Sequence, residues 1–344
     1  MSLVSVILPT YNRSDSLCRA AKSVLDQSYA DLELIVVDDA STENIEAVVR
    51  QWNDERVRLV RRAANGGAAA ARNTGLAHAK GRFIAFQDSD DIWLPGKLDR
   101  QMKLLATLPP SVGAVTGSKL LYRSGNRQRR VLPQVSVEPA PENAISLECD
   151  QLEHLLWENR LSVQNALFRR DCYPCDEWFD PRAKANEDWD FAVRLARRTK
   201  IFEHLEPVVL AFASADSVSS SNRRQHIGAV RLMKKNKDLK PRFPQHFSYN
   251  EFYLGRFLAA TGKPRLGFRF VAAALVAYPS LLKLIIRRKL ERAFGRISLR
   301  GMEAGTRPST RSENGDAGGI AVACLQKATM QGFCEPTDCP ARSD

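Results

Sequence analysis

Phe83-Ile-Ala-Phe-Gln-Asp-Ser-Asp-Asp91 runs from an apolar segment directly into three carboxylates. Carboxylates repel one another and resist burial, so such a cluster at the end of a strand requires a cation or solvent. Mg²⁺ and Mn²⁺ prefer oxygen ligands and commonly join one or two carboxylates to the phosphates of a substrate. Ligands of open α/β sheets bind at the carboxyl ends of the strands, so this stretch predicts a metal–diphosphate site. A solvated acidic turn is the alternative when the stretch is taken alone.

The segments around this stretch alternate between strand and helix patterns. We predict strands over 4–8, 32–37, 57–60 and 83–86, and helices over 16–25, 45–52 and 68–79. Ser14 or Asp15 is the expected N-cap of the first helix. This alternation indicates right-handed βαβ units and a parallel sheet. The predicted fold class is therefore α/β, with a Rossmann-like nucleotide-binding half over residues 1–110.

The pattern is looser after Pro109-Pro110. We predict strands over 112–116, 119–122 and 207–212, helices over 152–157 and 189–197, a basic hairpin or loop over 123–130 and a linker over 133–141. Residues 226–300 are expected to form a basic, amphipathic helical region. Residues 301–344 are rich in Gly, Ser, Thr and Pro, a composition that predicts a disordered tail.

The length of 344 residues allows two domains or one large one. A strand pattern begins within three residues of the start, so we expect no secretory signal. The seven cysteines are scattered, and Cys172 and Cys175 form a lone pair without the second pair that a zinc site requires. Reduced thiols and a cytoplasmic location are the expectation.

The positive charge is concentrated in one segment. Residues 223–300 hold 19 Lys and Arg against three Asp and Glu, whereas residues 1–222 hold 28 against 30. The apolar stretch 266–286 contains Arg269, Pro279 and Lys283, which a membrane-spanning helix tolerates poorly. We therefore predict a helix lying in an anionic membrane interface, as peripheral contact through 223–300. A core helix with a solvated basic end is the alternative, and no nucleic acid is expected, because no aromatic–basic stacking pattern accompanies the charge.

Five segments follow predicted strands or precede a helix and could converge at one sheet edge. They are Pro9-Thr-Tyr-Asn12, Asp38-Asp-Ala-Ser41, Ala71-Arg-Asn-Thr-Gly75, Asp88-Ser-Asp-Asp91 and Asn186-Glu-Asp-Trp189. The set resembles the family 2 glycosyltransferases over roughly residues 3–225. The resemblance implies a GT-A fold, a Rossmann-like mixed sheet flanked by helices, here with a helical basic C-terminal extension. It also implies that residues 1–110 bind a nucleotide sugar and that 111–225 form the acceptor-binding half of the same domain.

The resemblance also implies the nucleotide-binding residues, namely Pro9, Tyr11, Asp39, Arg72 and Asp88. Tyr11 would stack on the base, and Asp39 would accept a ring N–H, which favours uracil or thymine. Arg72 would bond the base or a phosphate, and Asp88 would approach the ribose or the metal. Asp38 would hold its loop or cap the next helix.

The same resemblance implies the metal and acceptor sites. Asp90 would bind Mn²⁺ or Mg²⁺ and Asp91 would orient its neighbours. Asp188 would be the general base that takes the acceptor proton, with Glu187 beside it, so that the reaction inverts the anomeric centre. A pair that caps the helix from Trp189 is the alternative for these two carboxylates. Trp189 would pack on a sugar face or fill the core.

One element departs from the family pattern. Phe212 and Ser214 stand where many members carry Arg and His. The predicted function is inverting, metal-dependent transfer of one sugar from a nucleotide sugar, UDP-linked, to a hydroxyl of a glycan or lipid-linked acceptor in cell-surface polysaccharide synthesis. The expected location is the cytoplasm or the inner face of the plasma membrane. The alternatives are a soluble or protein acceptor, with the basic segment as a partner surface, and a non-catalytic nucleotide-binding scaffold.

Overall fold

The computed structural model describes residues 3–124, 134–140, 144–183, 185–213 and 222–289. The contacts within the chain divide it into two units, with the boundary between Ser221 and Asn222. The expected hairpin over 123–130 lies almost wholly outside the described residues, as do Ser214, residues 290–300 and the tail 301–344.

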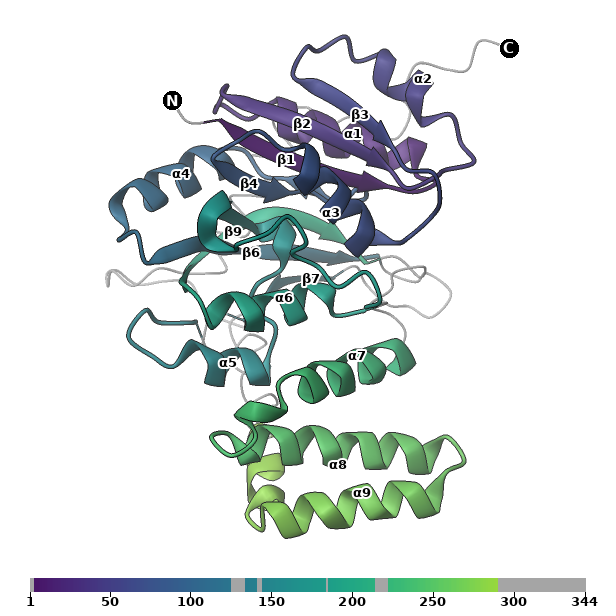
Figure 1. Ribbon diagram of the computed structural model, residues 1–344, viewed down its shortest axis with the longest axis vertical. Coiled ribbons are helices and arrows are strands. Elements are labelled where there is room, and N and C mark those ends of the chain that lie inside the picture. Colours follow the sequence, from purple (N-terminus) through teal and green to yellow (C-terminus); the bar gives the residue numbers. More distant parts are fainter. Residues whose placement is uncertain (1–2, 125–133, 141–143, 184, 214–221, 290–344) are drawn as a thin grey trace, which may run out of the picture. The chain divides into compact units, whose positions relative to one another are not determined.

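A mixed sheet forms the centre of the first unit (Figure 1). Within the described residues it has nine strands, of which eight follow the order β3-β2-β1-β4-β8-β6-β9-β5 while β7 pairs with β6. The strands are β1 Val4–Thr10, β2 Leu32–Asp38, β3 Val57–Arg61, β4 Phe83–Phe86, β5 Ile92–Trp93, β6 Val112–Arg123, β7 Gln134–Glu138, β8 Ala166–Arg169 and β9 Lys200–Phe212. The helices of this unit are α1 Ser14–Leu25, α2 Ile45–Arg50, α3 Ala68–His78, α4 Lys97–Thr107, α5 Gln151–Trp157 and α6 Glu187–Ala196.

The parallel half of the sheet confirms the predicted βαβ units. Strand β1 lies between β2 and β4 and is parallel to both, and β3 continues in the same direction beside β2. The register pairs Val4 with Leu32 on one side and with Phe83 on the other. The carboxyl ends of β1, β2 and β4 therefore meet at one edge, where the acidic segments follow.

Strand β1 is buried on both faces and shows how the helices attach to the sheet. Val4, Val6 and Leu8 belong to the hydrophobic cluster that contains the apolar face of α1. Ile7 points to the other face, against α3, where a Cβ built on Gly75 would lie 2.3 Å from Ile7 Cγ2. Glycine at this position lets α3 lie directly on β1.

The second half of this unit corrects several predictions. Residues 112–123 form one strand rather than two. β-bulges, at which the register with β9 shifts, let the strand continue through the interruption in its apolar pattern. Residues 134–138, predicted as linker, form β7, and β9 begins at Lys200 rather than at Pro207. Strands β5 and β8 and helix α4 were not predicted. The N-cap of α1 is Arg13 rather than Ser14 or Asp15, and its side chain makes no capping hydrogen bond. The Ser14 N–H at the start of the helix donates to Glu43 Oε2 at 2.8 Å.

The second unit consists of helices within the described residues. They are α7 Asn222–Lys235, α8 Pro244–Ala260, α9 Pro264–Ala277 and a last helix, Leu281–Lys289. Among the described residues, none of the helices alone has the length and apolar content to cross a bilayer. Helix α9 and the last helix reach that length and content only together, with a bend of 101° between them.

Candidate active site

Two loops at the carboxyl edge of the sheet are joined by Asn12. Its Oδ1 accepts the Thr42 N–H at 2.8 Å, and its own N–H donates to Ser41 Oγ at 2.9 Å. Asn12 and Ala40 have φ angles of 50° and 63°, a left-handed conformation that is strained for alanine. The network therefore holds the loops after β1 and β2 in one arrangement. Tyr11, beside Asn12, leaves 45% of its surface exposed at this edge.

Asp38 and Asp39 are both buried at the end of β2. Asp38 Oδ1 accepts the Ser41 N–H at 2.9 Å, whereas Asn44 caps α2, so Asp38 holds its loop and does not cap the helix. Asp39 accepts the backbone N–H groups of Gly66 and Gly67 at 3.1 and 2.7 Å and also pairs with Arg62. Asp39 thereby positions the loop that enters α3.

Pro9 lies inside β1, where it is buried and stands opposite Val37 of β2. It comes directly before Thr10, the last residue of the strand, and so lies next to the loop that carries Tyr11.

The acidic stretch after β4 presents its carboxylates in three different environments. The side chains of Asp88 and Asp90 are 29% and 32% exposed, and Asp90 pairs with Arg13 at the start of α1. Asp91 is buried and accepts the Phe212 N–H from the end of β9 at 3.1 Å. Burial, and then the charges of Asp88 and Asp90, raise the pKa of Asp91 to about 7. Asp91 thus joins the stretch to β9, while Asp88 and Asp90 remain accessible.

Arg72 connects the acidic stretch to a second acidic segment more than ninety residues further along the chain. It is buried on α3, and its two terminal nitrogens donate to Asp88 Oδ1 and Glu187 Oε1, each at 2.8 Å. Its guanidinium also lies 5.5 Å from the centre of the Phe179 ring. Burial alone would lower the pKa of Arg72, but the charges of Asp88 and Glu187 outweigh it and raise that pKa. The arginine stays charged and draws the two segments together.

Asp188 follows Glu187 in the first turn of α6 and is partly buried. Its Oδ2 accepts the Asn159 side-chain amide at 2.9 Å, and its Oδ1 accepts the Trp189 N–H at 2.8 Å. Burial raises its pKa to about 6, helped by the charge of Glu187 and opposed by Arg72 and Lys119. A carboxylate with a raised pKa, oriented by fixed donors, has the properties of a general base.

Packing beneath α6 fixes the position of this acidic pair. Phe191 stacks on Trp178 at a centroid distance of 5.1 Å and contacts Phe168 of β8 edge-on at 5.7 Å. The Trp189 indole N–H donates to the Leu155 carbonyl of α5. Trp189 of α6 is therefore anchored to α5 and is half-buried. Asn186, just before the pair, has a φ of 59°.

The oxygen donors here fit a divalent cation shared with a substrate. Within the described ranges, no group of three or more His, Cys, Asp or Glu side chains is arranged to hold a metal by itself. A Mg²⁺- or Mn²⁺-type ion held by one or two carboxylates and completed by phosphates needs no such group. Asp90, and Asp88 beside it, offer accessible hard oxygens, and the Arg13 guanidinium on Asp90 shows that a positive charge can be accommodated there.

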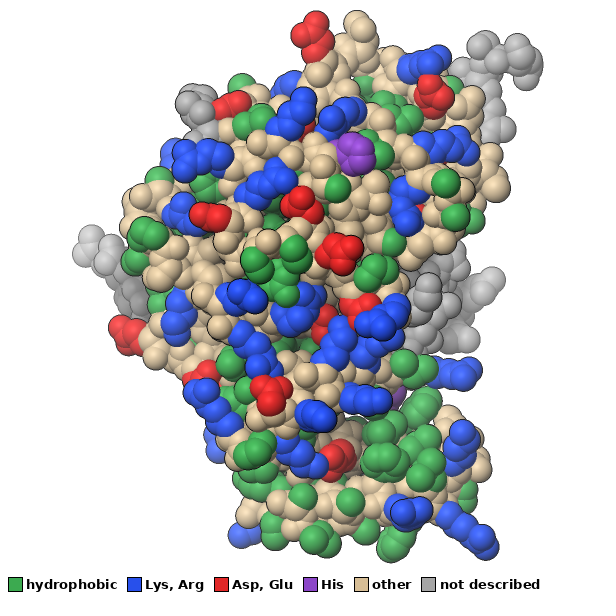
Figure 2. Space-filling model, in the orientation of Figure 1, with side chains coloured by type: hydrophobic (Ala, Val, Ile, Leu, Met, Phe, Trp, Pro, Cys, Tyr) green, Lys and Arg blue, Asp and Glu red, His purple; other side chains and the backbone are tan. Residues whose placement is uncertain are grey.

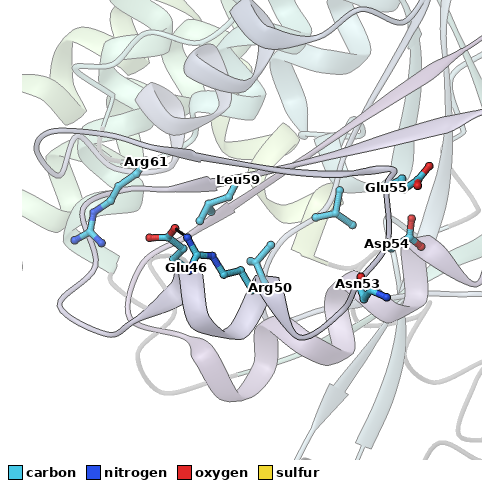
Figure 3. Close-up of a pocket in the computed structure, with 9 residues that line it drawn as sticks. Glu46, Arg50, Asn53, Asp54, Glu55, Leu59 and Arg61 are labelled. Carbon is cyan, nitrogen blue, oxygen red and sulfur yellow. Dashed lines mark hydrogen bonds and ion pairs between the residues drawn. The ribbon is translucent and has the colours of Figure 1, made fainter.

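A shallow hollow of the first unit lies away from these residues, between α2 and β3 (Figure 3). Glu46 and Arg50 at its margin pair with each other along α2. Arg61 connects the hollow to the site, because its side chain also lies 3.6 Å from Asp38 Oδ2. The acidic residues described above do not line it.

Comparison with known proteins identifies the chain. The model of the family described as glycosyl transferase family 2 matches residues 5–172. Residues 5–172 therefore form a domain of glycosyl transferase family 2. The fold is also found in the mannosyltransferase PcManGT from Pyrobaculum calidifontis in complex with GDP-Man and Mn²⁺, with a TM-score of 0.57 at 21% identity over 96% of this chain and 87% of that one. The fold is therefore of the GT-A type.

Two curated relatives match part of this family 2 chain. One is the Escherichia coli UDP-Glc:alpha-D-GlcNAc-diphosphoundecaprenol beta-1,3-glucosyltransferase WfgD, 47% identical over 30% of this chain and 41% of the relative. The other is the putative teichuronic acid biosynthesis glycosyltransferase TuaG of Bacillus subtilis, 46% identical over 36% of this chain and 49% of the relative. The chain thus spans less than half of the length of these relatives.

The structure adds residues to the site of this family 2 member that sequence patterns did not indicate. Arg13 pairs with Asp90, Asn159 orients Asp188, and Lys119 of β6 acts electrostatically on Asp188. None of them lies in a run of like residues or at a diagnostic spacing. Asn73 of α3 exchanges two hydrogen bonds with the Phe179 backbone, at 2.7 and 3.0 Å, and so fixes the helix to the segment before α6.

Proposed function

We propose that the chain transfers one sugar from a UDP-sugar to a hydroxyl group, with inversion at the anomeric carbon and with a divalent metal. One observation carries the proposal: Arg72 bonds both Asp88 and Glu187, and Asp188 follows directly. Residues suited to a nucleotide diphosphate and a residue suited to deprotonate an acceptor thus lie around one buried cation. Membership of glycosyl transferase family 2 supports this assignment.

The donor nucleotide would lie over the loops after β1 and β2. Tyr11 offers an exposed aromatic face on which a base can stack. Asp39 can accept the ring N–H of uracil if the Arg62 guanidinium moves away, because Arg62 is the one side-chain donor among the partners described for Asp39. The relative named as using UDP-Glc supports uracil as the base.

The metal would be held by Asp90, with Asp88 close to the ribose or sharing the ion. A bound Mn²⁺ or Mg²⁺ supplies Lewis-acid stabilisation of the diphosphate that leaves. The mannosyltransferase PcManGT, whose structure is known in complex with GDP-Man and Mn²⁺, has the same fold. On this side of the site the protein's own residues align the donor: Arg72 fixes Asp88, and Asp91 ties the acidic stretch to β9.

On the acceptor side, Asp188 takes the hydroxyl proton as that oxygen forms a bond to the anomeric carbon. The bond from this carbon to the diphosphate oxygen breaks, and its electron pair leaves with the nucleotide. Attack from the face opposite the leaving group inverts the anomeric centre. Asn159 and the Trp189 N–H hold the Asp188 carboxylate in position for the proton transfer.

The proposed acceptor is a lipid-linked glycan in cell-surface polysaccharide synthesis. The relatives support this class, since one is named for a diphosphoundecaprenol acceptor and the other for teichuronic acid biosynthesis. The donor sugar depends on loop geometry around the anomeric carbon and is to be found by screening UDP-hexoses.

Replacement of Asp188 by Asn tests the proposal. We expect a loss of about 10²- to 10⁴-fold in kcat, the contribution of a positioned base, with unchanged affinity for UDP. Transfer is measured with a screened UDP-sugar and a synthetic lipid-diphosphate acceptor, and UDP binding by calorimetry. The control is Asp190→Asn on the same helix, whose carboxylate pairs with Arg194 instead and should leave turnover intact. Full turnover in Asp188→Asn would rule out the assigned base.

A further inference from the structure

The helices of the second unit pack around a small core of their own. A Cβ on Gly267 of α9 would lie 2.4 Å from the Gly255 carbonyl oxygen of α8, so the two helices approach closely at this pair of glycines. Ala274, Leu281 and Ile285 are buried together in one cluster and join α9 to the last helix. These contacts use one side of α9 and one side of the helix Leu281–Lys289.

The remaining sides of the two helices expose large apolar side chains. On α9, Phe268 is 73% exposed and Val276 is 82% exposed. On the last helix, Leu282 is 51% exposed and Ile286 is 58% exposed. These four residues, here called the exposed apolar set, lie on consecutive helices of one unit. Figure 2 shows hydrophobic side chains on the surface of α8 and α9 with lysine and arginine among them.

Basic residues accompany the exposed apolar set on the same two helices. Their exposed members are Arg265, Arg269, Lys283, Arg287 and Lys289. Residues 222–289 contain 16 Lys and Arg against two acidic residues, Asp238 and Glu251, and Glu251 pairs with Lys240 at 2.8 Å. The surface of this unit therefore combines apolar side chains with a large excess of positive charge.

We propose that α9 and the last helix dock this chain onto an anionic lipid bilayer, lying in its interface without crossing it. The exposed apolar set would enter the boundary between headgroups and acyl chains, while the basic residues contact lipid phosphates. The bend of 101° between the helices suits two segments that lie along a surface. A second copy of the chain would bring two positive surfaces together, and nucleic acid would leave the apolar set in water, so both fit less well.

This docking goes beyond the proposed function, because it would place sugar transfer at the surface of a lipid bilayer. It does not require the chain to be a transferase, since vesicle binding and sugar transfer are measured separately. If the protein binds vesicles but does not transfer sugar, the proposed function fails and the docking stands. If it transfers sugar to a soluble acceptor analogue without binding vesicles, the docking fails and the proposed function stands.

Co-sedimentation with vesicles tests the docking. The full chain is mixed with vesicles of phosphatidylglycerol and phosphatidylcholine, or of phosphatidylcholine alone, at low and high salt. We expect binding that requires phosphatidylglycerol and weakens with salt. The double variant Phe268→Glu/Val276→Glu should bind at least about tenfold more weakly, because it removes buried apolar area and adds repulsive charge. Equal binding by this variant, or none by the wild type, would overturn the proposal.

The matched control is Leu205→Glu, a similar change at a 51% exposed leucine of the first unit, which should bind vesicles as the wild type does. Circular dichroism verifies that the double variant is still helical. Phe268→Leu changes the same position without adding charge, and we expect this variant to retain binding to vesicles. Two further measurements test the other possible partners: light scattering gives the oligomeric state, and titration with duplex DNA gives the affinity for nucleic acid. A dimer dissociated by the double variant, or tight binding to DNA without binding to vesicles, would contradict lipid docking.

Discussion

Asp188, the proposed general base, combines a raised pKa with a fixed orientation. Asn159 and the Trp189 N–H hold its two oxygens, and burial next to Glu187 makes ionisation harder than in water. Arg72 limits this effect, because its charge favours the ionised form. The residue is thereby poised to accept a proton near neutral pH.

The raised pKa of Asp188 predicts the pH dependence of transfer. A base acts only when ionised, and its pKa is about 6, so kcat/KM should fall as the pH drops below 6 and level off above it. The measurement is a pH profile of kcat/KM between pH 5 and pH 8.5, with UDP affinity followed in parallel.

One variant of the first unit serves as the control for this profile. Asp91→Asn removes the carboxylate whose pKa is about 7 and should leave the break near 6 in place. A flat profile, or a break that moves away in Asp91→Asn, would contradict the assignment to Asp188.

At the scale of elements, the parallel strands and the helix α3 place the site. The carboxyl ends of β1, β2 and β4 meet because the three strands are parallel and in register. Helix α3 lies on β1 and carries Arg72 at the level of the acidic stretch. This depends on Gly75, where any side chain would meet Ile7.

Gly75→Ala should destabilise the first unit. The added Cβ would lie 2.3 Å from Ile7 Cγ2, so helix and strand must separate, at a cost of about 1–3 kcal/mol in the free energy of unfolding. Denaturant unfolding measures it. The double variant Ile7→Ala/Gly75→Ala should lose less stability than the sum of the two single changes, since the smaller residue makes room for the methyl group. Simple additivity of the two changes would show that the contact is not the cause.

The sequence patterns predicted β1, β2 and β4 because each is a mostly apolar run followed by turn or acidic residues. They missed β5, which has two residues, and β8, whose four residues are too few for a periodicity. The acidic segments could be found from their place after strands. The partners Arg13 and Asn159 could not, because their roles depend on which loops meet in three dimensions.

At the scale of the whole molecule, charge differs between the two units. Residues 1–222 are nearly balanced in charge, with the acidic groups of the site held by Arg13 and Arg72, whereas residues 223–300 are strongly basic. The first unit carries the acidic groups that we propose to hold the metal of the donor diphosphate. The second offers what an anionic surface requires. The proposed transfer of a sugar depends above all on the metal–diphosphate site at the edge of the sheet.

The most direct test is a thermal-shift measurement with UDP and GDP, each with and without Mn²⁺, on the wild type, Asp90→Asn and the control Asp176→Asn, an exposed carboxylate that pairs with Arg170. Binding to the native state must raise the melting temperature. We predict a shift with UDP that requires Mn²⁺, is absent in Asp90→Asn and is retained in Asp176→Asn. No shift with either nucleotide, or an equal shift in Asp90→Asn, would contradict a metal–diphosphate site at Asp90.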